Sequence, residues 1–220
     1  MANHRKLFDH ELSELKEHLL KMGASAENAI KNSIIALVEK NEELAKEVIE
    51  QDYKINTMEK ITDDTVVRLI TQQQPVAKDL RRLIIAFKMN ASFERMGDLA
   101  RNIAKTALRL EMKISDQTAE RLLQISDLVQ KMVHNILQAY ADENEDFAKE
   151  IALEDHRVDA LYKNFLNFLF CQVDNNAKSA EQATQLAFVG RHLERIGDHV
   201  TNIAELLVYL EEAKRLNLNK

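Results

Sequence analysis

The chain has 220 residues and a formal net charge of −6 at pH 7, with 45% hydrophobic and 30% charged residues, a balance that indicates a globular protein. An acidic chain is a poor partner for nucleic acid, whose phosphates require a basic surface. The single cysteine, Cys171, indicates a reducing compartment, and neither a signal peptide nor a run of about 18 apolar residues is visible. We therefore expect a cytoplasmic protein.

Four glycines and one proline are too few for the turns of a sheet-rich fold, and helical periodicity is nearly continuous. The sequence therefore predicts an all-α fold with six helices, at about 4–38, 42–73, 76–112, 116–140, 145–173 and 179–216. The expected helix starts are Asn41, Ser115 and Asn144 as N-caps, Pro75 in a first turn, and Ser179 in a capping box with Gln182.

The second and fifth predicted helices begin with related sequences. The segment "NEELAKEVIEQDYKIN" starts at Asn41 and "NEDFAKEIALEDHRVD" starts at Asn144, an offset of 103 residues. The two segments place Asp52 and Asp155 at matching positions. Four residues later stand Asn56 and Asp159, so each helix carries two oxygen-bearing side chains on one face.

The third and sixth predicted helices share a stronger repeat. "ERMGDLARNIA" at 94–104 and "ERIGDHVTNIA" at 194–204 are identical at seven of eleven positions, with an offset of 100 residues. Glu94 and Asp98 continue an apolar line that includes Leu83, Ile84 and Phe87. A second line on this helix is formed by Ile85, Met89, Phe93, Met96, Ala100 and Ile103. The acidic residues thus stand where packing residues are expected.

These two repeats indicate that a three-helix unit is duplicated. We expect two tandem antiparallel three-helix bundles, at residues 1–112 and 113–220, because helices of this length cannot bury their apolar stripes alone. No Gly-, Pro- or Ser-rich linker separates them, so the bundles should pack side by side.

If the second and third helices of each unit face each other, four oxygen-bearing side chains meet in each half. The sets are Asp52, Asn56, Glu94 and Asp98 in the first half, and Asp155, Asp159, Glu194 and Asp198 in the second. Oxygen ligands suit hard cations such as Mg²⁺, Mn²⁺, Ca²⁺ or Fe³⁺. Gly97 and Gly197, inside the motifs, would leave room for a neighbouring helix or a ligand.

Salt bridges are the alternative interpretation of these sets. Arg81, Arg82 or Arg101 could neutralise the first pair of acids, and Arg191 or Arg195 the second. The matched duplication leaves the two interpretations about even. His192 and His199 flank the second motif, but surface histidines are the simpler interpretation. The Glu-x-x-His pattern of di-iron bundles is absent, which counts against a carboxylate-rich metalloenzyme.

With its paired Glu-Arg-x-Gly-Asp motifs, each followed by Asn-Ile-Ala, the chain resembles the PhoU family over essentially its whole length. The resemblance implies a fold of two three-helix repeats and metal ions at the repeated acidic motifs, with iron, manganese, magnesium and zinc all open. It also implies a non-enzymatic, homodimeric negative regulator of the phosphate-starvation response. Such a regulator would link the ATPase subunit of the phosphate ABC transporter Pst to the sensor histidine kinase PhoR, and would reach the membrane only through these partners.

A metalloenzyme and a metal-free helical scaffold remain the alternatives to this regulator. The acidic motifs cannot attract phosphate directly, because phosphate is an anion. We therefore expect the protein to respond to the conformations of its partners rather than to bind phosphate at these motifs.

Overall fold

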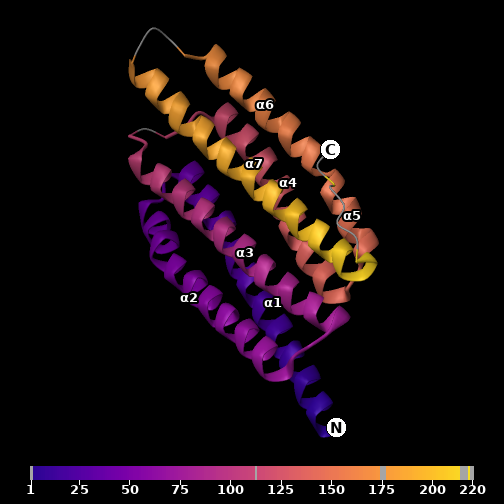
Figure 1. The fold of residues 1–220 in the computed structure, drawn as a ribbon. Coiled ribbons are helices and arrows are strands. Elements are labelled where there is room, and N and C mark those ends of the chain that lie inside the picture. Colours follow the sequence, from indigo (N-terminus) through magenta and orange to yellow (C-terminus); the bar gives the residue numbers. More distant parts are fainter. Residues whose placement is uncertain (1, 112, 174–176, 214–217, 219–220) are drawn as a thin grey trace.

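The structure is a computed structural model that describes residues 2–111, 113–173, 177–213 and 218. All regular secondary structure in these ranges is helical, which confirms the predicted all-α class (Figure 1). The helices are α1 (Ala2–Glu39), α2 (Glu42–Gln73), α3 (Ala77–Arg109), α4 (Asp116–Asp142), α5 (Glu145–Leu153), α6 (Asp155–Cys171) and α7 (Ala177–Glu212).

Three of the predicted helix starts are confirmed by their capping hydrogen bonds. The side chain of Asn41 accepts from the backbone N–H of Leu44, and that of Asn144 accepts from Phe147, each at 3.0 Å. Ser115 caps α4 in the same way, through the N–H of Thr118 at 3.3 Å. Each cap satisfies a backbone donor that the first helical turn leaves without a partner.

Two predicted helix starts are wrong. Pro75 lies in the loop before α3 rather than in its first turn, because Gln74 adopts a left-handed conformation that ends α2 and extended Val76 leads into α3. Ser179 lies inside α7, which already begins at Ala177. Alanine and lysine are good helix formers, and Lys178 also pairs with Glu111 at 3.2 Å.

The predicted helix 145–173 is also wrong as a single element, since it is divided into α5 and α6 at Glu154. The backbone N–H of Glu154 donates to the carbonyl of Ile151 at 3.0 Å, and that of Arg157 donates to the carbonyl of Glu154 at 2.9 Å. These i-to-i+3 bonds form a tight 3₁₀-type turn. The turn lies directly before Asp155, and α2 has no break at the matching position.

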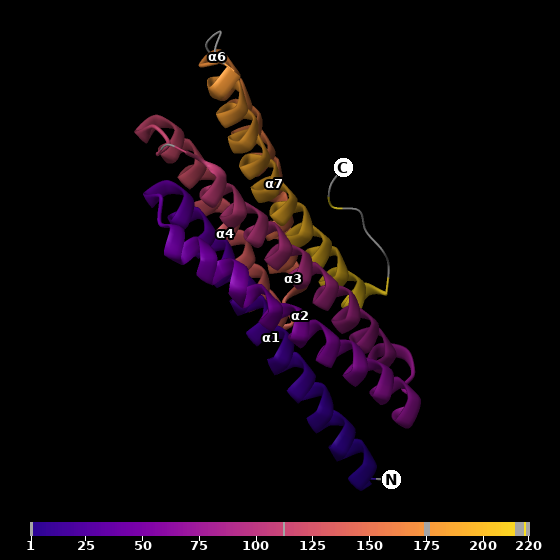
Figure 2. The same cartoon turned by 90° about the vertical axis from the view of Figure 1, so that its left-hand side faces the viewer.

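The helices form two bundles that lie side by side (Figures 1 and 2). α1, α2 and α3 make the first bundle, and α4, α7 and the α5–α6 pair make the second. α3 and α7 pack against each other along the seam, and α1 also contacts α4. α3 and α7 run antiparallel, because Lys78 at the start of α3 pairs with Glu211 at the end of α7 at 2.7 Å.

The hydrophobic core continues from one bundle into the other. Of the two apolar lines predicted on α3, the line from Ile85 to Ile103 is buried throughout and forms part of this core. The other line is only partly a packing line: Leu83 is buried, but Ile84 and Phe87 are 37% and 46% exposed. The reason is geometric, since α1, α2 and α7 cover the other sides of α3.

No helix in the described ranges has the length and the apolar character that crossing a bilayer would need.

Candidate functional site

The structure brings the predicted oxygen-bearing side chains together in two groups. The first acidic cluster lies between α2 and α3 and consists of Asp52, Asn56, Glu94 and Asp98. The second acidic cluster lies between α6 and α7 and consists of Asp155, Asp159, Glu194 and Asp198.

An arginine lies within the first acidic cluster. The guanidinium of Arg101 donates to Asp52 at 2.5 Å and pairs with Asp98 at 2.8 Å, so it joins the α2 acid to the motif acid. Asn56 donates to the same Asp52 carboxylate at 3.2 Å. Arg95, which is 61% exposed, pairs with Asp98 at 3.3 Å. One of the arginines that the salt-bridge interpretation named, Arg101, therefore does contact the acids of this half.

The other two arginines considered for the first cluster bind elsewhere. Arg81 donates to the backbone carbonyl of Leu210 at 3.4 Å, and Arg82 donates to Glu143 at 3.3 Å. Both contacts connect the first turns of α3 to the second bundle. These two arginines thus join the two bundles instead of neutralising the acidic cluster.

The second acidic cluster has no such bridging cation. The position that matches Arg101 is occupied by Thr201, which is fully buried. Arg191 contacts Glu194 from one side, but no described arginine or lysine pairs with Asp155 or Asp198. Among the described residues, the four acidic side chains of the second acidic cluster therefore have only one paired cation, Arg191.

Burial, and then repulsion among the acids, weakens the carboxylic acids of the second cluster. Burial raises the pKa of Glu194 to about 7, with Asp198 adding to the effect and Arg191 opposing it. Burial also raises the pKa of Asp155 to about 6, again with Asp198 and then Asp159 contributing. Like charges held together out of water disfavour the ionised form of each carboxyl.

The first cluster shows the same effect more weakly and includes a residue that sequence reasoning missed. Burial and then the neighbouring Asp98 raise the pKa of Glu94, and Glu59 on α2 contributes to that shift. Glu59 has its own pKa raised by burial and by Asp63. Glu59 stands seven residues after Asp52 on the same face of α2, so extending the acidic line by one more turn would have found it.

The motif glycines do provide room for close approach, as expected. A Cβ atom on Gly197 would lie 2.8 Å from a carboxylate oxygen of Asp155, and one on Gly97 would lie 2.9 Å from the terminal methyl carbon of Ile55. In the second half the glycine thus makes space for the carboxylate itself, whereas in the first half it makes space for an apolar side chain.

The donor set of the second cluster fits a hard cation better than that of the first. One buried carboxylate oxygen of Asp155 and one of Glu194 lack a hydrogen-bond partner there, and in the first cluster Asp52 and Asn56 each have one partnerless oxygen as well. In the first cluster the guanidinium of Arg101 takes the place that a cation would fill. No three carboxylate, histidine or cysteine side chains in the described residues are already arranged to hold an ion, so binding would require the side chains to close around it.

Among the described residues, the two histidines beside the second motif make no hydrogen bond to these partnerless oxygen atoms. His199 lines a separate cavity between α3 and α7. His192 is half-buried, and its Nδ1 atom has no hydrogen-bond partner in the described residues. Burial, and secondarily Arg195, lowers the pKa of both imidazoles.

Comparison with known proteins places this arrangement in a family. The family model described as "PhoU domain" matches residues 19–107 and 122–207. The chain is 38% identical, over 98% of its length and 99% of the relative's, to the "Phosphate-specific transport system accessory protein PhoU homolog" of Clostridium acetobutylicum. It is 34% identical to the "Phosphate-specific transport system accessory protein PhoU" of Escherichia coli K12, over 92% of this chain and 84% of that one.

Solved structures agree with these sequence matches. The crystal structure of the "phosphate transport system regulatory protein PhoU" from Streptococcus pneumoniae superposes with a TM-score of 0.88 at 31% identity, covering 96% of this chain and 99% of that one. PhoU from Pseudomonas aeruginosa gives 0.89 at 36% identity, covering 94% and 100%. Together with the domain matches in both halves, these similarities show that the chain belongs to the PhoU family.

Proposed function

We propose that this protein is an accessory regulator of a phosphate-specific transport system. The observation that carries the proposal is the similarity over nearly the whole chain to relatives named as accessory or regulatory proteins of phosphate transport. The family model matches both halves of the chain, so the proposal applies to the whole two-bundle molecule.

In the finer form of this proposal, the protein is a cytoplasmic, homodimeric and non-enzymatic negative regulator of the phosphate-starvation response. It couples the ATPase subunit of the Pst transporter to the sensor kinase PhoR and restrains phosphate uptake. It reaches the membrane only through these partners. The family resemblance supports this form, and the acidic clusters agree with it, because they would repel phosphate and so make poor primary sensors of it.

The function is tested by deleting the gene in its native host. In phosphate-rich medium the deletion strain is expected to express a phosphate-starvation reporter that the parent keeps silent, and a plasmid copy should silence it again. Pull-down from the same cells should recover the Pst ATPase and PhoR. A reporter that stays silent in the deletion strain would contradict the proposal.

We also propose that the acidic clusters hold metal, with the second cluster as the stronger site. Asp155, Asp159, Glu194 and Asp198 would be the ligands there, and the ion would supply the positive charge that this half lacks. The support is that no described arginine bridges these acids, together with the partnerless oxygens and the raised carboxyl pKa values of Asp155 and Glu194. Iron, manganese, magnesium and zinc are all candidates.

Elemental analysis of the purified, untagged protein tests this site. Metal is expected in the wild type and should be lost in Glu194→Gln/Asp198→Asn. It should also be lost in Thr201→Arg, which introduces the guanidinium that the first half already has. The matched control is Glu94→Gln/Asp98→Asn in the first cluster, which should retain most of the metal. Wild-type protein that takes up no ion, even after incubation with each candidate metal, would exclude the site.

A further inference from the structure

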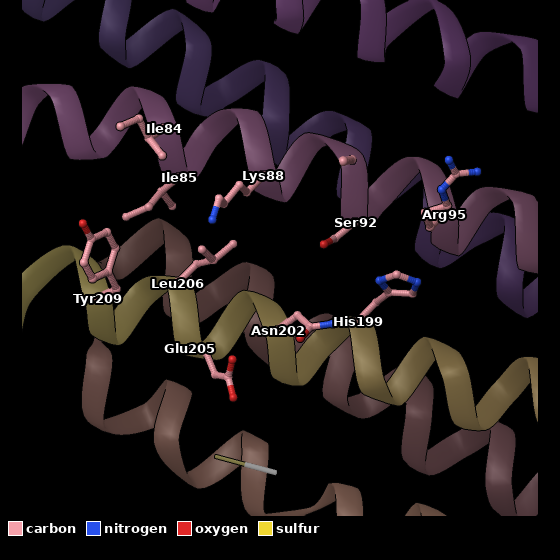
Figure 3. Close-up of a pocket in the computed structure, with 11 residues that line it drawn as sticks. Ile84, Ile85, Lys88, Ser92, Arg95, His199, Asn202, Glu205, Leu206 and Tyr209 are labelled. Carbon is pink, nitrogen blue, oxygen red and sulfur yellow. The ribbon is translucent and has the colours of Figure 1, made fainter. Parts of the chain in front are cut away.

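A cavity of about 460 Å³ lies between α3 and α7, apart from the acidic clusters (Figure 3). It is bounded by the N-terminal half of α3 and the C-terminal half of α7, where the two bundles meet. Sites between packed units commonly bind ligands, and cavities of about 300–1,000 Å³ hold small organic molecules. The oxygen atoms of both acidic clusters lie outside its lining.

One end of the cavity is apolar. Ile84 and Ile85 come from α3, and Leu206 and Tyr209 come from α7. Figure 3 shows Ile85 directed toward α7, and Leu206 and the Tyr209 ring directed toward α3. Ile84 is 37% exposed, whereas its neighbour Ile85 is buried. This end therefore offers apolar and aromatic walls to the body of a ligand.

The other end is lined by polar side chains that the fold leaves without partners. Among the described residues, the side chains of Lys88, Ser92, His199 and Asn202 make no hydrogen bond or ion pair with one another or with any other residue. In Figure 3, Lys88 and Ser92 point from α3 toward α7, and His199 points back toward α3. Four groups able to donate hydrogen bonds thus face one space.

The cavity lining contains a cation, Lys88, that no described carboxylate pairs with. Lys88 places its ammonium group there, and Arg95 lies at the rim with its guanidinium held by Glu94 and Asp98. The lining contains one carboxylate, that of Glu205, which points away from α3 and accepts the backbone N–H of Leu218 at 2.8 Å. The polar end is therefore suited to an anion.

We propose that this cavity binds a small organic phosphate ester. Its phosphoryl group would lie against Lys88, Ser92 and His199, and its ring or other apolar body would lie against Ile85, Leu206 and Tyr209. The cavity is larger than inorganic phosphate needs, and the apolar end would contribute nothing to binding a bare anion. Because both bundles line the cavity, an occupant would contact the two repeats at once.

The experiment follows the methyl NMR signals of Ile85 and Leu206 in the full-length protein. AMP is the probe for a phosphate ester with a planar body, adenosine provides the body alone, and orthophosphate provides the anion alone. AMP is expected to shift both signals in a saturable way, and adenosine and orthophosphate should each bind at least about tenfold more weakly, since each lacks half of the contacts.

Two variants test the two ends of the cavity. Lys88→Gln should weaken AMP binding by about tenfold, and Ile84→Glu should weaken it comparably by placing a charge at the apolar end. Both residues are exposed, so the fold should survive, which circular dichroism would check. The matched control is Lys46→Gln, an exposed lysine on α2, which should change the affinity less than about twofold.

Three results would overturn the proposal. Methyl signals that do not move with AMP would exclude the site. Orthophosphate binding as tightly as AMP would reduce it to a simple anion site. Equal AMP affinity in Lys88→Gln and the wild type would show that the phosphoryl group does not bind at this end of the cavity.

Discussion

At the level of single residues, the two repeats differ most in how they neutralise their acids. Arg101 joins Asp52 to Asp98 in the first half, and buried Thr201 takes its place in the second. One half thus carries a built-in cation between its acids, whereas in the other half no described arginine or lysine pairs with Asp155 or Asp198. A duplicated motif can therefore keep its acids while only one copy keeps the arginine that joins them.

Removing Arg101 should destabilise the protein strongly. Arg101→Leu leaves the carboxylate of Asp52, which is 6% exposed, without its charged partner, and an unpaired buried charge costs about 3 kcal/mol. Urea denaturation measures the change in the free energy of unfolding. The control is Arg95→Leu, which removes an arginine that is 61% exposed and should cost less than about 0.5 kcal/mol. Equal losses in the two variants would count against a structural role for the Arg101 bridge.

The raised pKa of Glu194, about 7, predicts how the stability of metal-free protein depends on pH. The folded state binds the proton of this carboxyl more tightly than the unfolded state does. Its contribution is therefore fully present below the ordinary pKa of 4.5 and is lost as the pH rises through about 7. Between pH 5 and 8, wild-type protein in EDTA should lose about 2 kcal/mol more stability than Glu194→Gln.

The comparison with Glu194→Gln is needed because other groups titrate in the same range. His192 and His199 have lowered pKa values, so they add stability as the pH rises through their transition, which opposes the effect of Glu194. Both histidines are kept in the variant. Denaturation curves at several pH values give the two slopes, and parallel slopes would contradict the raised pKa of Glu194.

The sequence alone was sufficient to predict which acidic residues lie together, but it did not show which arginine pairs with them. Acids four residues apart on a helix must share a face, so the helical period determines their grouping. An arginine side chain is long and can reach several partners, which is why Arg81, Arg82 and Arg101 could not be distinguished from spacing. Aligning the two motifs position by position would have paired Arg101 with Thr201 and revealed the asymmetry.

At the level of helices, the N-cap residues could be predicted from the sequence, but the break between α5 and α6 could not. Asn41, Ser115 and Asn144 cap through local hydrogen bonds, which depend on a few neighbouring residues. The break at Glu154 has no local signal in "IALEDH", where no glycine or proline occurs. It coincides with the position where Asp155 approaches Gly197, a contact between elements distant in sequence.

The two motif glycines should respond differently to the same substitution. In Gly197→Ala the new Cβ would meet the buried carboxylate of Asp155 at 2.8 Å, and relieving this clash should cost about 1 kcal/mol even after alanine's gain in helix propensity. In Gly97→Ala the new Cβ meets the flexible end of Ile55 at 2.9 Å, so the two effects should nearly cancel. Thermal denaturation of both variants provides the comparison.

A double variant separates the clash from the helix propensity. In an Asp155→Ala background the carboxylate is gone, so adding Gly197→Ala should stabilise the protein, by up to about 1 kcal/mol. If Gly197→Ala destabilises both backgrounds equally, the glycine is required by something other than the carboxylate.

For the whole molecule, the seam between α3 and α7 determines how the two repeats behave. The core is continuous across it, and the ion pair between Lys78 and Glu211 joins the start of α3 to the end of α7. Helical periodicity and the duplication predicted two bundles packed side by side. They could not predict the cavity at the seam, because its walls come from residues more than 100 positions apart in the sequence. Without the position of α7, nothing distinguishes Ile84 and Lys88 from other exposed residues of α3.

A shared core predicts that the two bundles unfold together. Phe165 lies on α6, is 1% exposed and packs against α7, so Phe165→Ala should lower the free energy of unfolding by about 3–5 kcal/mol. If the molecule unfolds as one unit, the most protected amides of α1, around Leu19 and Met22, should lose the same amount, although α1 belongs to the other bundle. Native-state hydrogen exchange measures both. Unchanged protection in α1 would mean that each repeat is its own folding unit, and that contact across the seam is too weak for one repeat to sense the state of the other.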